Sequence, residues 1–238
     1  MTAVRTGTGW IGLGLMCKPP RPGTSKTRLA GSIGPEAAAR LSQAFLEDCA
    51  HSAREAAAIA RLLPRAFFRP EDGRQELATI LGPDWPLTLA DSGDLGATMI
   101  EVLAQLLAEC PAGAMIMGAD MPLMGKAAIV EAAEALRAGG TDGVVIIPSA
   151  DGGYCLLGIR SLAAARALCA PMAWSTPTVL AETCRRAEIA GLAVQSLAVQ
   201  RDIDEQADLG WLKAELARDA TAAPSTRRTI NALQAMVQ

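Results

Sequence analysis

The chain has 238 residues, of which 50% are hydrophobic and 3% aromatic, and its formal net charge is -3. This length and hydrophobic content exclude a chain that is disordered throughout, and they suit one large α/β domain or two small ones. The slightly negative charge argues against nucleic acid or an anionic membrane as a general partner, because both require an extended positive surface.

Cysteine usage and the lack of long apolar segments predict a cytoplasmic location. The six cysteines form no C-x-x-C pair and show no metal-ligand spacing, so reduced thiols in the core are expected. The apolar run at 10–17 is too short for a secretory signal, and no stretch reaches about 18 uninterrupted apolar residues.

Strand and helix patterns alternate along the chain. Apolar runs predict strands at 10–17, 66–69, 87–90, 114–117, 144–148, 155–159 and 193–199. Helical spacing and capping residues predict helices at 36–63, before 82, from 94 past 107, and at 126–137, 162–168, 176–190, 205–216 and 229–237. This alternation indicates an α/β fold with a mostly parallel central sheet and helices on both faces.

The first strand leads into a basic loop with the sequence K-P-P-R-P-G-T-S-K-T-R-L at 18–29. Lys18, Arg21, Lys26 and Arg28 supply four positive charges within eleven residues. Three prolines and one glycine keep the loop out of regular structure, and we expect its backbone N–H groups to point at a ligand. A loop after the first strand lies at the carboxyl edge of the sheet, where ligands bind. A polyphosphate ligand is therefore preferred over a solvated basic turn.

This loop matches neither of the two common phosphate-binding motifs. It lacks the G-x-x-x-x-G-K-S/T spacing of a P-loop and the G-x-G-x-x-G pattern of a dinucleotide-binding turn. His51 is the only histidine in the chain, which leaves no support for a multi-histidine metal site, and it falls off the apolar stripe of its helix.

Asp120 lies just past the predicted strand at 114–117, after Gly118 and Ala119, and precedes Met121 and Pro122. A carboxylate at a strand end can present oxygens to Mg²⁺ or Mn²⁺ in the crevice above the sheet. The alternative is an N-terminal cap for the helix at 126–137, but Asp120 lies too early for that. We predict that Asp120 binds the metal.

Asp202 and Asp204 follow the last predicted strand and would point the same way if extended geometry persists. Asp204 also directly precedes the helix at 205–216, where an aspartate is a favoured cap. We assign Asp202 as the second metal-binding carboxylate and Asp204 as the cap.

Asp151, Gly152, Gly153 and Tyr154 form a turn between two strands, and Tyr154 is the only tyrosine. The double glycine is explained either by turn chemistry or by close approach of the backbone to a ligand. Composition alone leaves both explanations open.

Four motifs together resemble a bacterial nucleotide-diphospho-sugar transferase-like family, often described as radical-SAM or selenodomain-associated glycosyltransferases. The family is related to phospholactate guanylyltransferases and molybdopterin nucleotidyltransferases. The motifs are the loop at 18–29, G-A-D-M-P-L at 118–123, D-G-G-Y at 151–154, and D-I-D at 202–204 with Asp208-Leu209. The resemblance implies a single-domain glycosyltransferase-A-type fold at 1–217, followed by a C-terminal linker and a short helix or tail at 218–238.

The resemblance also implies roles for further residues. The loop residues Pro22, Gly23, Thr24 and Ser25 would bind the nucleotide together with Asp94 and Gly96 of a D-L-G motif. Ala90 and Thr98 replace the polar residues that flank this motif in the family. Asp151, Gly152, Gly153, Tyr154 and Trp174 would contact the acceptor substrate, although Trp174 also suits a hydrophobic staple for the helix that Thr176 would cap.

The preferred functional hypothesis is a Mg-dependent nucleotidyltransferase that moves a nucleotide from a nucleoside triphosphate to a small acceptor bearing a phosphate or phosphonate. Lys18, Lys26 and Arg28 would hold the phosphates, and Asp120 with Asp202 the metal. The alternatives are a glycosyltransferase that uses a nucleotide-sugar and a non-catalytic nucleotide-binding protein. We expect small-molecule partners, no nucleic acid and no membrane, and a homodimer remains open.

Overall fold

The computed structural model describes residues 9–236, and its centre is one seven-stranded sheet with the strand order β3-β2-β1-β4-β6-β5-β7. All neighbouring strands are parallel except β6, which runs antiparallel to β4 and β5. The strands are β1 (Ile11–Cys17), β2 (Leu62–Phe68), β3 (Leu87–Leu89), β4 (Ala114–Met117), β5 (Gly143–Pro148), β6 (Tyr154–Ile159) and β7 (Ala193–Ser196).

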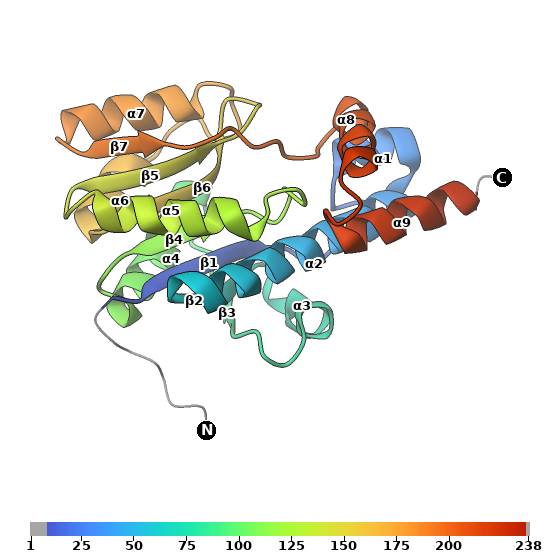
Figure 1. Cartoon of the computed structure of the whole chain (residues 1–238), viewed down its shortest axis with the longest axis horizontal. Helices are drawn as coiled ribbons and strands as arrows, with labels where there is room; N and C mark the ends of the chain where they lie inside the picture. Colours follow the sequence, from blue (N-terminus) through green and yellow to red (C-terminus); the bar gives the residue numbers. More distant parts are fainter. Residues whose placement is uncertain (1–8, 237–238) are drawn as a thin grey trace.

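Helices cover both faces of this sheet, as the sequence predicted (Figure 1). Helices α2 and α5 pack on one face in one hydrophobic cluster, and α4 and α6 pack on the other face in a second cluster. The helices are α1 (Thr27–Ile33), α2 (Pro35–Ala60), α3 (Arg74–Leu81), α4 (Leu95–Glu109), α5 (Lys126–Ala138), α6 (Leu162–Cys169), α7 (Val179–Ile189), α8 (Gln206–Arg218) and α9 (Pro224–Ala235), with a 3-10 turn η1 (Glu71–Gly73) before α3.

The reversed direction of β6 follows from the short turn that precedes it. The turn between β5 and β6 contains only Ser149 to Gly153, and Ser149 N donates to Gly153 O at 3.0 Å. A parallel neighbour would need a crossover of a dozen or more residues. The glycine-rich motif therefore closes a hairpin, and this places it beside the carboxyl end of β4.

The boundary between α2 and β2 differs from the prediction, which continued the helix to residue 63 and began the strand at residue 66. The helix ends at Ala60 because Arg61 adopts a left-handed conformation with φ 48°. Leu62 then begins β2 and pairs with Ile11 of β1. The apolar pair at 62–63 suits either element, and only the pairing with β1 decides between them.

The C-terminal helix begins earlier than the predicted start at residue 229, and its predicted end at residue 237 lies outside the described residues. Helix α9 begins at Pro224 and joins a third hydrophobic cluster with residues of α1, α2 and α8. The buried carboxylate of Asp48 in α2 accepts hydrogen bonds from Ser225 N and Thr226 N at 2.9 and 2.8 Å. Asp48 thus caps α9 from a neighbouring helix and fixes it to the domain.

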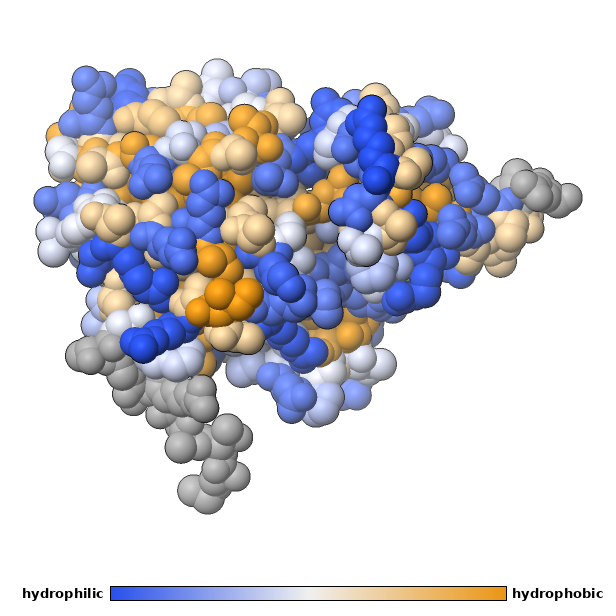
Figure 2. Space-filling view, in the orientation of Figure 1, coloured by the Kyte–Doolittle hydropathy of each residue, from blue (hydrophilic) through white to orange (hydrophobic). Residues whose placement is uncertain are grey.

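On the face shown, hydrophilic residues are spread widely and alternate with smaller hydrophobic patches (Figure 2). Between residues 9 and 236, no helix combines the length and the apolar character that crossing a membrane requires.

Candidate active site

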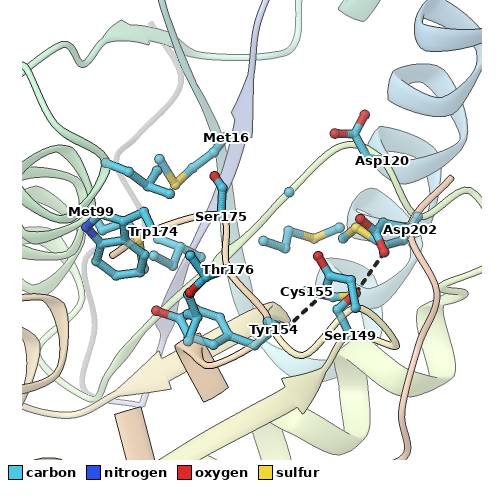
Figure 3. Close-up of a pocket in the computed structure, with 18 residues that line it drawn as sticks. Met16, Met99, Asp120, Ser149, Tyr154, Cys155, Trp174, Ser175, Thr176 and Asp202 are labelled. Atoms are coloured by element: carbon cyan, nitrogen blue, oxygen red, sulfur yellow. Dashed lines mark hydrogen bonds between the residues drawn. The ribbon is translucent and has the colours of Figure 1, made fainter. Parts of the chain in front are cut away.

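Two adjoining cavities lie where β1 and β4 end, and they share Met16, Leu95, Gly118, Asp120, Trp174 and Ser175. We call the larger one, of about 670 Å³, the basic lobe, because Lys18, Lys26, Arg28 and Arg69 line it. The smaller one, of about 340 Å³, is the apolar lobe, which Figure 3 shows. Since Asp120 and Trp174 line both cavities, the two lobes form one crevice with a common junction.

Lys26 occupies the junction in a network of charges. Its Nζ lies 2.6 Å from Asp204 Oδ1 and 2.9 Å from Asp120 Oδ1, and its side chain is only 4% exposed. Burial acts to lower the pKa of Lys26, but the charges of Asp120 and Asp204 outweigh this effect and raise it above its usual value. Lys26 therefore remains protonated at neutral pH.

Backbone contacts bring the two acidic segments together although they are far apart in the sequence. Ile203 N donates to Asp120 O at 3.1 Å, and the Ile203 side chain is fully buried. This anchor places Asp202 in the apolar lobe and Asp204 in the basic lobe, on either side of Ile203. The expected convergence of Lys26 with Asp120 is present.

The predicted role of Asp204 as a helix cap is wrong. Glu205 is the N-cap of α8, and a capping box joins it to Asp208, whose carboxylate also accepts from Asp204 N at 3.1 Å. With the helix end already satisfied, the Asp204 carboxylate is free to pair with Lys26.

The basic loop is organised in part by its own hydrogen bonds. Thr24 N and Ser25 N both donate to Arg21 O, at 3.2 and 3.0 Å. Ser25 Oγ accepts from Arg21 N and donates to Pro19 O. Thr24 and Ser25 line the basic lobe, whereas Pro22 and Gly23 do not.

Arg21 fixes the loop to the neighbouring helix and is not among the residues that line the basic lobe. Its guanidinium binds Glu76 at 2.6 Å and Asp72 at 3.0 Å. The hydrogen bonds from Arg21 hold the pKa of Glu76 below its usual value. Arg69, which sequence reasoning missed, lines the lobe instead, from the end of β2.

Asp202 lies in a more protected position than Asp120. Ser149 Oγ donates to Asp202 Oδ1 at 2.8 Å, and burial raises the pKa of Asp202 despite this hydrogen bond. The charges of Asp151 and Asp204 raise it further. A nearby cation would relieve this accumulation of negative charge.

The carboxylates of Asp120 and Asp202 fit Mg²⁺ only if a substrate supplies further ligands. The described part of the chain contains no cluster of three or more His, Cys, Asp or Glu side chains that could hold a metal. Mg²⁺ is commonly bound by one or two carboxylates together with substrate phosphates and water. Asp120 and Asp202, which both line the apolar lobe, meet that lower requirement.

The apolar lobe is bounded by aromatic and aliphatic side chains on one side and by acidic ones on the other. Figure 3 shows Met16, Met99 and Trp174 across the cavity from Asp120 and Asp202. Tyr154 Oη and Trp174 Nε1 are both buried, and Trp174 Nε1 has no hydrogen-bond partner within residues 9–236.

The hairpin glycines serve different purposes. Gly152 adopts φ +91°, and a Cβ there would lie 2.2 Å from Pro177 O, so this glycine allows the hairpin to pack on the segment before α7. Gly153 lines the apolar lobe, and its N–H donates to Asp151 Oδ1 at 2.9 Å. Asp151 also lines the lobe, whereas Gly152 does not.

The structure places the D-L-G motif outside both cavities except for its leucine. Asp94 caps α4 by accepting from Ala97 N at 2.9 Å, and Gly96 lies behind Trp174. Thr98 is buried, accepting from Ser92 N and donating to Asp94 O. Thr98 lines the basic lobe, but its hydroxyl already makes these two hydrogen bonds.

Substituting Gly96 with alanine is expected to destabilise the protein by several kcal/mol, because the new Cβ would lie 2.3 Å from Cys169 O and 2.9 Å from Trp174 Cζ2. Either contact forces a backbone shift or moves Trp174 out of the crevice. Urea denaturation measures the free energy of unfolding. The matched control is Gly210→Ala in α8, where a Cβ meets nothing within 4 Å and stability should rise by up to about 1 kcal/mol. Equal stability of the two variants would contradict this packing role.

Comparison with known proteins shows similarity to a family of bacterial proteins and to a transferase. Residues 50–176 match the profile of the DUF2064 family, described as "uncharacterized protein conserved in bacteria". A 2-phospho-L-lactate guanylyltransferase from Methanoregula boonei is 29% identical over 194 residues, which cover 80% of this chain and 78% of that protein.

Solved structures share the fold. A proposed nucleotide-diphospho-sugar transferase from Desulfovibrio desulfuricans G20 superposes with a TM-score of 0.82 at 23% identity, covering 95% of this chain and 97% of that one. A nucleotidyl transferase from Methanothermobacter superposes with a TM-score of 0.60 at 14% identity, covering 87% and 98%. The single α/β fold of glycosyltransferase-A type, expected from the motifs, is therefore confirmed.

Proposed function

The chain belongs to the DUF2064 family. From the geometry of its crevice and its similarity to a guanylyltransferase, we propose that it is a nucleotidyltransferase. It would transfer a nucleotide from a nucleoside triphosphate to a small acceptor that bears a phosphate or phosphonate, with release of pyrophosphate. The guanylyltransferase from Methanoregula boonei supports this class of reaction.

The observation that carries the proposal is the position of Lys26 between the two lobes. The basic lobe has four cationic side chains and the larger volume, which suits a triphosphate better than the two phosphates of a nucleotide-sugar. Lys26 Nζ and Asp120 Oδ1 lie 2.9 Å apart at the place where the basic lobe meets the apolar lobe. Transfer between two substrates requires such a junction, because the reacting atoms must be held together in line.

The reaction needs few groups from the protein beyond charge and alignment. An acceptor phosphate oxygen would attack the α-phosphorus, a new P–O bond would form, and the bond to the α,β-bridging oxygen would break. Pyrophosphate then leaves with the electron pair. The attacking phosphate is already anionic, so no general base is required, and Lys18, Lys26 and Arg28 would stabilise charge on the phosphates.

A bound Mg²⁺ would supply charge neutralisation at the phosphates when present. Asp120 and Asp202 are the residues that would hold it, and Asp204 would keep Lys26 oriented. Ser149 fixes the Asp202 carboxylate through its 2.8 Å hydrogen bond.

A ligand panel tests the proposal and does not require the acceptor to be identified first. The thermal midpoint is measured with each of four nucleoside triphosphates and with the matching nucleotide-sugars, with and without Mg²⁺. We expect one triphosphate, GTP being the first to try, to raise the midpoint more than its nucleotide-sugar, and to do so only with Mg²⁺.

The opposite ranking would overturn nucleotidyl transfer and favour a glycosyltransferase. Triphosphate binding without pyrophosphate release, across a panel of organic phosphates and phosphonates, would instead indicate a nucleotide-binding protein without turnover. Pyrophosphate release is measured by a coupled phosphate assay in the same samples.

A further inference from the structure

The two lobes of the crevice differ sharply in charge. Four lysine and arginine side chains line the basic lobe, whereas none lines the apolar lobe within the described residues 9–236. The apolar lobe has instead three carboxylates, those of Asp120, Asp151 and Asp202. A substrate that occupies both lobes would therefore meet opposite fields at its two ends.

Two arginines from segments next to the apolar lobe are held elsewhere. Arg201 stacks over Trp211 at 5.1 Å, with Nε 3.8 Å from Asp208 Oδ1. Arg186 Nε lies 2.7 Å from Glu182 Oε1, and its Nη1 donates to Ala170 O at 2.6 Å. Moving either arginine into the apolar lobe would break these contacts. A second anionic group on the acceptor would therefore find no cationic partner there.

We propose that the acceptor is a small organic phosphate or phosphonate that also carries an amine. This inference rests on the proposed function. The anionic group lies at the junction, near Lys26 and the metal-binding carboxylates, and the amine lies in the apolar lobe near Asp151.

Asp151 is the residue that recognises the amine. Asp151 is exposed and lines the apolar lobe, and its Oδ1 accepts from Gly153 N at 2.9 Å. Its second oxygen accepts no hydrogen bond from residues 9–236 and is available to an ammonium group. Asp202 is less suited to this role, because it is half-buried, bonded to Ser149 and assigned to the metal.

The rest of the lobe suits a compact organic cation. Trp174 and Tyr154 contribute aromatic surface, which attracts cations through the electrons of the ring face. Burial raises the pKa of Tyr154, so its hydroxyl stays neutral. A volume of about 340 Å³ lies at the small end of ligand sites, which favours a short acceptor.

Three compounds of similar size test the charge preference: 2-aminoethyl phosphate, ethyl phosphate and phosphoglycolate. Their dissociation constants are measured by calorimetry with Mg²⁺ and the α,β-methylene analogue of the triphosphate selected by the panel, which blocks transfer. We expect 2-aminoethyl phosphate to bind at least about tenfold more tightly than ethyl phosphate, and phosphoglycolate to bind most weakly.

Variants at Asp151 separate charge from shape. Asp151→Asn keeps an oxygen for Gly153 N and should remove most of the preference for the amine, while Asp151→Lys should favour phosphoglycolate. Asp142→Lys, an exposed change at the opposite end of β5, is the control and should keep the wild-type ranking.

Each outcome decides the inference. Equal or tighter binding of phosphoglycolate by the wild type, or an unchanged ranking in Asp151→Lys, would overturn it, as would failure of all three compounds to bind. Binding of the triphosphate analogue is recorded in the same samples. If that binding persists, the failure concerns the acceptor and not nucleotidyl transfer.

Discussion

Replacing Lys26 with alanine should lower kcat for nucleotidyl transfer by at least about a hundredfold, the cost typical of losing one preorganised charge. Its ammonium group is the only one described that contacts both Asp120 and Asp204, at 2.9 and 2.6 Å. Without it, the phosphates and the two carboxylates repel one another across the junction. Pyrophosphate release under saturating substrate measures the change.

Two further variants isolate the charge of Lys26. Lys26→Met keeps the apolar stem, including its proximity to Phe45, where the ammonium lies 5.9 Å from the ring centroid, and should lose as much activity as Lys26→Ala. Lys213→Ala removes an exposed lysine of α8 and should leave kcat unchanged. If Lys26→Met keeps more than about a third of wild-type kcat, charge at this position is not what transfer needs.

The order of strands and helices followed from local patterns, because each buried strand is a short aliphatic run bounded by turn residues. β4 and β5 illustrate this, since all of their residues are buried and the sequence predicted both strands to within one residue. The placement of the basic loop at the carboxyl end of β1 followed in turn. The antiparallel direction of β6 was not predicted, although the shortness of the turn before it contains that information.

Roles that depend on distant partners were harder to predict. Asp204 precedes a helix, so a local interpretation makes it a cap, yet it pairs with Lys26 across 178 residues of sequence. Arg21 and Lys26 are both cationic residues of the same loop, so the local sequence does not distinguish them. The difference is that Asp72 and Glu76 bind Arg21. Charge composition identifies a phosphate-binding loop but does not identify which of its cations face the ligand.

The D-L-G motif shows a different difficulty. The resemblance gave Gly96 a nucleotide-binding role. Its position in the structure instead explains why the residue is a glycine, because Gly96 packs against Cys169 and Trp174. Gly96 still influences the crevice, because it makes room for the tryptophan that lines both lobes. A motif residue can thus act on a site through the packing of a neighbour.

Replacing Asp120 with asparagine should abolish the Mg²⁺-dependent part of the thermal stabilisation by triphosphate and lower kcat by at least about a hundredfold. Asparagine keeps the shape of the side chain and removes the charge that both Mg²⁺ and Lys26 require. Asp120 is half-exposed, so the substitution leaves no buried unpaired group and the fold should be retained. Titration of the thermal midpoint with Mg²⁺ supplies a measurement independent of turnover.

The comparison with Asp204→Asn separates the metal from the lysine. Asp204 contacts Lys26 and lines the basic lobe, but it is not among the residues that line the apolar lobe with Asp120 and Asp202. We therefore expect Asp204→Asn to weaken triphosphate binding while keeping its Mg²⁺ dependence, and Asp142→Asn to change neither. Should Asp120→Asn respond to Mg²⁺ as the wild type does, the carboxylate of Asp120 serves only to orient Lys26, and the metal, if one is used, binds elsewhere.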